Sequence, residues 1–322
     1  MSDFRDAVVA AWQVGGSGRQ WQPSELQQQL PDEPLWLHLD RANSGLGLWL
    51  RQVAGVPDAA VSALLDEDTR PRLDHYGEGV MLILRGVNAT DAAGEPEMVS
   101  LRLWIAANRI ITLRKRSLAS VRAVRHRYEE GRGPQQIGEL LVTLVENLNE
   151  PMDKVTDAFE ASFENREHAS GERQVKAAMS RVVRLRTGLV SLRRYIHPQQ
   201  VALTKLLAAP PSWLSERDAA LLRNAVDDVA RQVEDLAALT ERATLLHDHL
   251  SQQLAERLNR NMYLLSMVTV VFMPLTMVTG LLGVNLAGIP GADHPWAFTL
   301  LCSALALLTL FELWLFRRIH LL

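Results

Sequence analysis

Two long apolar segments near the C-terminal end constrain the fold of this chain more than any other feature. No charged residue occurs between Arg260 and Asp293. A helix of residues 262–282 would be roughly 31 Å long, close to the hydrocarbon thickness of a bilayer, about 30 Å. Residues 296–316 form a second segment of similar length, in which Glu312 is the only charged residue. The sequence therefore predicts two transmembrane helices joined by a short loop, 283–295.

The basic residues around these segments predict their orientation. Arg257 and Arg260 precede the first segment, Arg317 and Arg318 follow the second, and the loop contains neither lysine nor arginine. Because basic flanks stay in the cytoplasm, we expect both termini there and the loop outside.

The residues before the membrane segments indicate a soluble region with two parts, an α/β part followed by a helical part. With 322 residues, the chain is too long for one ordinary compact core. Residues 1–135 have the pattern of an α/β domain, with a half-buried strand in which Arg102 and Trp104 face away from the core, and a later helix capped by Ser117. The expected strands are 35–39, 79–87, 98–106 and 109–114, the last three as an antiparallel meander, and the expected helices are 43–54, 57–66 and 117–130.

From about residue 136 the pattern is helical throughout. Helices are expected over about 137–168 and 172–207, and a third begins near Ser215 and has no stop signal before about 282. At 1.5 Å per residue this third helix would be roughly 100 Å long, the length of a stalk that enters a membrane. We therefore expect three parts: 1–135, 136–260 and 261–322.

Composition and motifs exclude several classes of function. The net charge of −3 does not suit a nucleic-acid-binding protein. The one cysteine, Cys302, allows neither an intramolecular disulfide nor a cysteine-rich metal site. The sequence has no phosphate-binding loop, dinucleotide fingerprint or nucleophile–base set, so we expect neither an enzyme nor a catalytic cofactor.

Polar residues and methionines follow one stripe of the first membrane segment. Their spacing alternates between three and four, which places them on one face of a helix. Such a stripe should face protein or water rather than lipid, and several copies around an axis would line a narrow wet pore. The stripe consists of Asn259, Met262, Ser266, Thr269, Met273, Thr276 and Gly280.

Other interpretations of these residues stay open at this point. Serine and threonine hydroxyls often bond to their own helix, and methionines often only pack. The two segments could be a simple anchor for a scaffold or sensor with a coiled-coil stalk. Glu312 could be a carboxylate that reaches water at the membrane interface.

The order of these features resembles the CorA-type divalent metal ion transporters. A long stalk helix, two C-terminal spans and a Gly-Xaa-Asn tripeptide after the first span are common to that family. Here the tripeptide is Gly283-Val284-Asn285, which, with Thr69-Arg70-Pro71-Arg72, is similar to the ZntB zinc transporter branch. Ala287 departs from that branch, where glycine is usual.

The resemblance implies a homopentamer with an α/β cytoplasmic funnel, in the inner membrane of a bacterium. It implies that the tripeptide forms the outer mouth, where Asn285 meets the hydrated ion, and that the stripe lines the pore. Asp248 matches a position at the cytoplasmic exit, and Asp293 with His294 could attract cations outside. It also implies transport of Zn²⁺, with protons as a possible coupling ion that travels with water or acts in the funnel.

The chemistry of the stripe agrees with a cation that keeps its water. Amide and hydroxyl oxygens are hard, neutral ligands, unlike the cysteine and histidine that bind dehydrated zinc. They give no reason to prefer zinc over magnesium, cobalt or nickel, and the direction of transport stays open. Uptake is what a passive pore with an inward-negative potential would favour.

Overall fold

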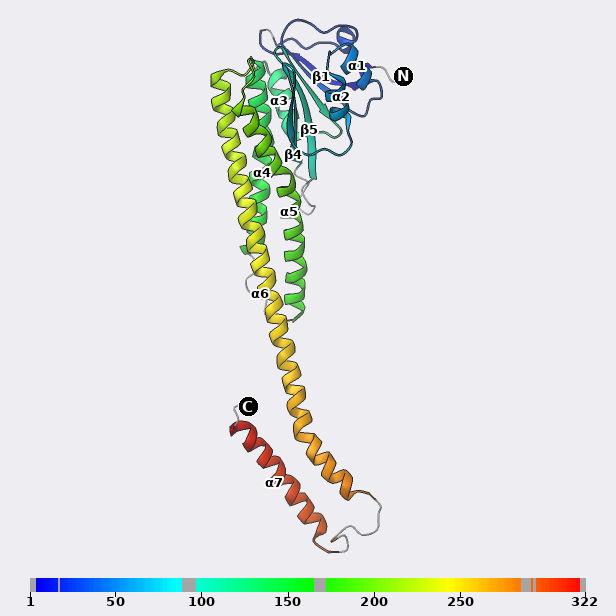
Figure 1. Ribbon diagram of the computed structural model, residues 1–322, viewed down its shortest axis with the longest axis vertical. Helices are drawn as coiled ribbons and strands as arrows, with labels where there is room; N and C mark the ends of the chain where they lie inside the picture. The colour runs from blue at the N-terminus through cyan, green and yellow to red at the C-terminus, as the bar shows by residue number, and fades with distance from the viewer. Residues whose placement is uncertain are drawn as a thin grey trace. The chain divides into compact units, whose positions relative to one another are not determined.

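The computed structural model of the protein divides into two compact units, Met1–His247 and Asp248–Leu322. It describes residues 4–16, 18–88, 97–164, 172–284, 291 and 294–318. The expected boundaries at 135 and 260 stay predictions. Figure 1 shows the chain coloured from its N-terminus to its C-terminus.

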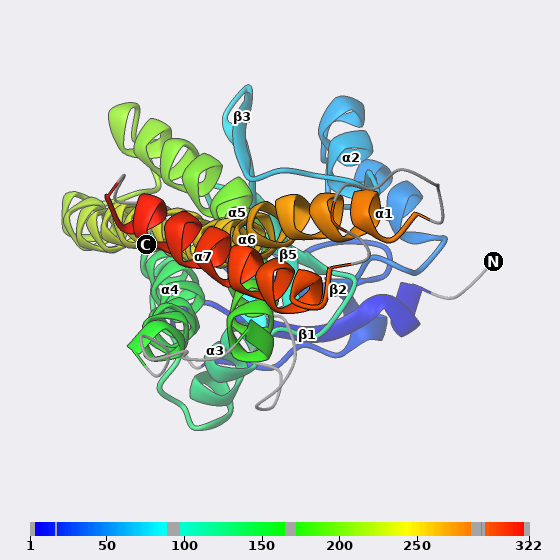
Figure 2. The same cartoon turned by 90° about the horizontal axis from the view of Figure 1, so that it is seen from below.

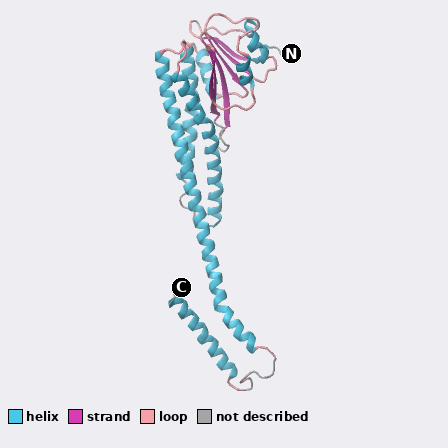
Figure 3. Cartoon of the chain, in the orientation of Figure 1, coloured by secondary structure: helices cyan, strands magenta, loops and turns pink. Residues whose placement is uncertain are grey.

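The first unit contains a mixed six-stranded sheet, drawn in magenta in Figure 3. Its spatial order is β1-β2-β6-β5-β4-β3. β2 and β6 pair in parallel, and the other neighbours are antiparallel. The meander expected from the sequence is confirmed as β4, β5 and β6. The strands are β1 Val8–Gln13, β2 Leu35–Asp40, β3 Arg72–Tyr76, β4 Gly79–Asn88, β5 Glu97–Ala106 and β6 Arg109–Arg114.

Helices cover both faces of this sheet. The short helices α1 (Leu46–Gln52) and α2 (Asp58–Leu65) pack with one face, on a core that includes Ile83 and Trp104. On β4, a Cβ at Gly86 would lie 2.4 Å from Leu148 of α4, which shows how closely that helix approaches. Figure 2 gives the view from below. The later helices of the unit are α3 Ala119–Glu129, α4 Ile137–Glu164 and α5 Glu172–Ala208.

Two local expectations are wrong. β5 is not half-buried, because Arg102 is 2 % exposed and Trp104 is 5 % exposed on the face that was expected to be open. Ser117 does not cap α3: the N-cap is Leu118, whose own side chain makes no capping bond. Instead the side chain of Asn88 accepts a hydrogen bond from the Ala119 amide at 3.4 Å.

The long helix is α6, Glu216–Leu282, and it is continuous over 67 residues with Pro274 inside it. Its start is capped as expected, because the Asp218 amide donates to Ser215 Oγ at 3.1 Å. A loop that contains Gly283 and Val284 follows, and then α7, Ala297–Arg318. Both helices have an apolar stretch long enough to cross a membrane.

Candidate ion pathway

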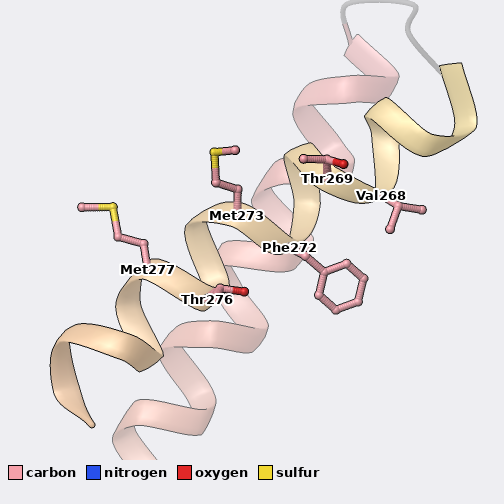
Figure 4. A pocket seen from close by; sticks show the side chains of 6 residues that line it. All are labelled: Val268, Thr269, Phe272, Met273, Thr276 and Met277. Carbon is pink, nitrogen blue, oxygen red and sulfur yellow. The ribbon is translucent and has the colours of Figure 1, made fainter. Parts of the chain in front are cut away.

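The stripe predicted from the sequence lies on one exposed face of α6 in the second unit. All seven residues are exposed, with Met262 at 67 % and Met273 at 66 %. An open hollow on this part of the helix is lined by Val268, Phe272 and Met277 together with Thr269, Met273 and Thr276. Figure 4 shows these six side chains with α7 as a faint ribbon behind them.

The opposite face of α6 is the one that is partly covered. Met267, Val271, Pro274 and Val278 are half-buried. At 100° per residue, the centre of this row lies roughly 150° around the helix from the centre of the stripe. On α7 the half-buried residues also share one face, formed by Leu301, Leu305 and Leu308 with the buried Glu312. The stripe is therefore part of the side of α6 that has no cover within the chain, which also includes apolar residues such as Leu265, Phe272 and Met277.

Hydroxyl groups in this span are of two kinds. Thr269 Oγ1 donates to the Leu265 carbonyl at 2.9 Å, and Thr279 Oγ1 donates to the Leu275 carbonyl at 3.0 Å. The side chains of Ser266 and Thr276 make no hydrogen bond to any part of the chain that the structure describes. Back-bonding therefore accounts for Thr269 but not for Ser266 or Thr276, whose oxygens stay available on the stripe.

The tripeptide and the outer loop are only partly described. Gly283 continues the helical pattern through its amide, which donates to the Thr279 carbonyl at 2.9 Å, and Val284 is 44 % exposed. Asn285 and Asp293 lie outside the described residues. His294 is described, and its Nδ1 accepts a hydrogen bond from the Trp296 amide at 3.2 Å. Because Nδ1 accepts this bond, the proton of a neutral His294 ring lies on Nε2, which then has no lone pair for a cation.

Asp248, the expected residue at the cytoplasmic exit, is an exposed side chain on α6. It precedes Asn259 by 11 residues, which is about three turns of helix, so it extends the line of the stripe. In the described ranges, no three His, Cys, Asp or Glu residues are grouped as a metal-binding cluster. The stripe thus offers single oxygen atoms and thioethers, not a chelating site.

Glu312 differs from the sequence expectation. It is 8 % exposed, and its Oε2 atom is buried with no hydrogen-bond partner among the described residues. An interfacial carboxylate that reaches water is therefore the wrong description. α7 exposes large apolar side chains such as Phe298 and Leu307 but buries this carboxyl group. The burial of Glu312 could not be read from its position near the end of an apolar segment.

Comparisons with known proteins agree with this arrangement along the chain. Residues 31–318 match the family described as "CorA-like Mg2+ transporter protein". The divalent cation transporter CmaX of Pseudomonas aeruginosa is 38% identical over 299 residues, which cover 90% of this chain and 88% of that protein. The zinc transport protein ZntB of Pectobacterium atrosepticum is 31% identical over 311 residues, which cover 97% of this chain and 95% of that protein.

Solved structures show the same fold. The full-length CmaX structure superposes with a TM-score of 0.79 at 33% identity, over 99% of this chain and all of the other. The complete CorA magnesium transporter of Methanocaldococcus jannaschii gives a TM-score of 0.78 at 17% identity, over 97% of this chain and 98% of the other. At 17% identity the second likeness concerns the fold alone.

Proposed function

This chain belongs to the CorA-like Mg²⁺ transporter family, and from that membership we propose that it carries Zn²⁺ across a membrane through a pore lined by α6. Transport of a metal cation is the activity named for its relatives in this family. To this family activity the proposal adds Zn²⁺ as the transported ion, a pore lined by α6 as the route, and an assembly of five chains. Five copies of the chain surround the route, with their termini in the cytoplasm and the loop after α6 outside.

The observation that carries this proposal is the uncovered stripe of α6. A single copy leaves polar side chains exposed on a helix that is apolar enough to span a membrane. Exposing Ser266 and Thr276 to lipid would leave their hydroxyls unpaired, which is unfavourable in hydrocarbon. Several copies that turn this face toward a common axis would place the same groups in water.

The chemistry of the stripe sets how the ion moves. Neutral oxygens bind a hydrated cation weakly, and weak binding lets the ion leave as readily as it enters. Met262 and Met273 add apolar, adaptable side chains at two levels of the same face. In this arrangement Asn285 gives the first contact outside, and Asp248 gives the last contact before the cytoplasm.

The choice of zinc rests on the relatives and on the middle residue of the tripeptide. A relative that is 31% identical is named as a zinc transport protein, and one that is 38% identical is named for divalent cations in general. Magnesium, cobalt and nickel are the alternative cargo, and zinc efflux is the alternative direction. An inward-negative potential favours entry of a cation through a passive pore. Protons are the coupling ion to test.

Flux into liposomes tests the proposal. Purified protein is reconstituted, and Zn²⁺ entry is followed with a trapped fluorescent indicator in parallel with Mg²⁺ and Ni²⁺. We expect Zn²⁺ entry that Asn285→Ala reduces strongly. Asn261→Ala is the matched control, because Asn261 is exposed on the same helix but lies roughly 100° from the centre of the stripe.

The possible outcomes distinguish a transporter from a scaffold, and zinc from another transported ion. If intact oligomers carry no metal ion at all, the chain is a membrane-tethered scaffold or sensor and the proposal is wrong. If Ni²⁺ or Mg²⁺ passes and Zn²⁺ does not, the route stands and the cargo is wrong. A pH indicator inside the same liposomes reports whether protons accompany the ion.

A further inference from the structure

In the first unit, α4 and the first half of α6 run side by side in the same direction (Figure 1). Near the start of α4, a Cβ at Gly138 would lie 2.5 Å from Oδ2 of Asp218 in α6. Near its end, the guanidinium carbon of Arg242 in α6 lies 5.4 Å from the ring centroid of Phe163. In both pairs the residue of α6 comes about 80 positions later in the sequence, so the two helices keep one register over this length.

On each helix a row of buried residues repeats every seven positions, as in a parallel coiled coil. The row on α4 is Val142, Asn149, Thr156 and Phe163, and the row on α6 is Ala225, Gln232 and Leu239. Apolar side chains at such a repeat pack almost equally well after one helix has moved along the other. The register between two helices of this kind is therefore commonly fixed by a polar residue in the row.

Two buried side-chain amides lie in these rows, and each bonds across the interface. Asn149 Nδ2 donates to the Ala225 carbonyl at 3.0 Å. Gln232 Nε2 donates to the Asn149 carbonyl at 3.2 Å and to Asp153 Oδ1 at 2.8 Å. Asn149 is 5 % exposed and Gln232 is 2 % exposed. If α6 moved along α4 by one turn, about 5.4 Å, Gln232 would lose the Asp153 carboxylate, and an unpaired buried amide is unfavourable.

The same contact is not the most stable one that this interface could have. Oδ1 of Asn149 is buried and has no hydrogen-bond partner among the described residues. A buried acceptor without a partner is unfavourable, and an apolar side chain of similar size at such a position is often neutral or stabilising. A buried asparagine in a seven-residue repeat specifies register at a cost in stability. The two amides therefore suit a role in register better than a role in stability.

We propose that Asn149 and Gln232 are positioning residues for transport, which fix the register of α6 against α4. α4 itself packs closely on the sheet, where Leu148 lies against Gly86 of β4. Because α6 is one continuous helix, its register at Gln232 also sets the level of the stripe along the helix axis. Without the two amides, α6 would occupy more than one register, and fewer copies would present the stripe at the same level. This consequence for flux rests on the proposed function, whereas the register itself does not.

Distances between spin labels on the two helices, measured by electron paramagnetic resonance, test the register. The labels are attached to Glu150→Cys on α4 and Ala238→Cys on α6, both at exposed positions, in full-length protein that also carries Cys302→Ser. With both amides present we expect one narrow distance distribution. Asn149→Leu and Gln232→Met replace each amide with an apolar side chain of similar size. Each should add a second distance or broaden the distribution by several Å, since one turn of helix is about 5.4 Å.

Thr156→Val is the matched control. Thr156 belongs to the same row of α4 and is 8 % exposed, but its hydroxyl donates to the Met152 carbonyl of its own helix at 3.1 Å. This substitution should leave the label distances and Zn²⁺ flux near the wild-type values. The two amide variants should keep or raise the midpoint of thermal unfolding and reduce initial Zn²⁺ entry into liposomes several-fold. A merely structural role of the amides would instead lower the midpoint and leave the label distances unchanged.

Three results would count against the positioning role. A single narrow distance distribution in both amide variants would overturn it, and so would equal broadening in Thr156→Val. Broadened distances with unchanged Zn²⁺ entry would overturn the link between register and transport. If the wild-type protein carries no metal ion, the proposed function is wrong, and the label distances alone still decide whether the amides fix the register.

Discussion

Thr276 and Thr279 lie three residues apart on α6, and Thr279 Oγ1 donates to the carbonyl of Thr276 at 3.1 Å. The Thr279 hydroxyl is thus satisfied within its own helix, whereas the Thr276 hydroxyl makes no hydrogen bond to the described part of the chain. Only Thr276 belongs to the stripe. The two threonines therefore form a matched pair for testing the ion pathway.

Thr276→Val should reduce Zn²⁺ flux several-fold, because it removes an oxygen that faces the pore and keeps the shape of the side chain. Thr279→Val should leave flux near the wild-type level, since that hydroxyl is already used by the helix. The measurement is initial Zn²⁺ entry into liposomes at equal protein content, with oligomer size checked by gel filtration. Equal effects of the two substitutions would argue against the stripe as the route.

Glu312→Gln should stabilise the protein in detergent and leave Zn²⁺ flux largely intact. The carboxyl group has a buried, unpaired oxygen among apolar surroundings, so replacing it with a neutral amide removes the cost of burying a charge. The midpoint of thermal unfolding should rise by a few degrees. If the substitution instead abolishes the pH dependence of flux in a folded oligomer, Glu312 lies on a proton route, and the hypothesis that protons travel with water is wrong.

Acid should destabilise the first unit through His38. Its Nδ1 lies 2.9 Å from Thr112 Oγ1, which itself donates to the Leu37 carbonyl, so Nδ1 is the donor in this bond. Burial lowers the pKa of His38 from 6.5 to about 3. Below pH 6.5 the unfolded chain therefore binds a proton that the folded chain does not, and stability falls as the pH falls toward 3.

At pH 5 the loss attributable to His38 should be about 2 kcal/mol. His38→Asn keeps a donor near Thr112 and does not titrate, so its stability should change less between pH 7 and pH 5. Urea unfolding followed by tryptophan fluorescence at the two pH values measures this difference. Parallel pH profiles for wild type and variant would mean that another group causes the acid sensitivity.

Gly79→Ala should destabilise the sheet. A Cβ at Gly79 would lie 2.3 Å from Cζ2 of Trp104, whose ring is 5 % exposed and has little room to move. Overpacking of this kind costs roughly 1–3 kcal/mol. The free energy of unfolding is measured for Gly79→Ala, Trp104→Phe and the double variant. Because the phenylalanine ring is smaller, Gly79→Ala should cost less free energy of unfolding in the Trp104→Phe background than in the wild type. If the costs of the two substitutions simply add in the double variant, the proposed clash is wrong.

The helices of this chain were more predictable than its sheet edges. The start of α6 at Glu216 and its end at Leu282 follow from a serine cap and a loop rich in glycine. β1 and β3, the two edge strands, were not predicted. β1 was missed although Val8 to Trp12 is a continuous apolar run, whereas β3 has no such run. In β3 the sequence Arg72–Tyr76 is mostly polar, and only its pairing with β4 makes it a strand.

Contacts between distant residues account for the other differences. Asn88 replaces Ser117 at the start of α3 because the fold brings β4 beside that helix. Arg102 is buried because the end of α2 supplies carbonyl groups 36 to 38 residues away in sequence. Neither partner can be identified from local spacing. The stripe on α6 depends only on the period of one helix, so its shared face was predictable, and its role in conduction stays a prediction.

Pro274 gives the first membrane helix a place where it can bend. Proline has no amide hydrogen, so the carbonyl of Val270, one turn earlier, loses its usual partner in the helix. A bend at this point breaks no backbone hydrogen bond, whereas a bend elsewhere in the span would. Met273 and Thr276 flank this joint on the stripe, so a small change of angle there would alter the width of the passage between these two levels.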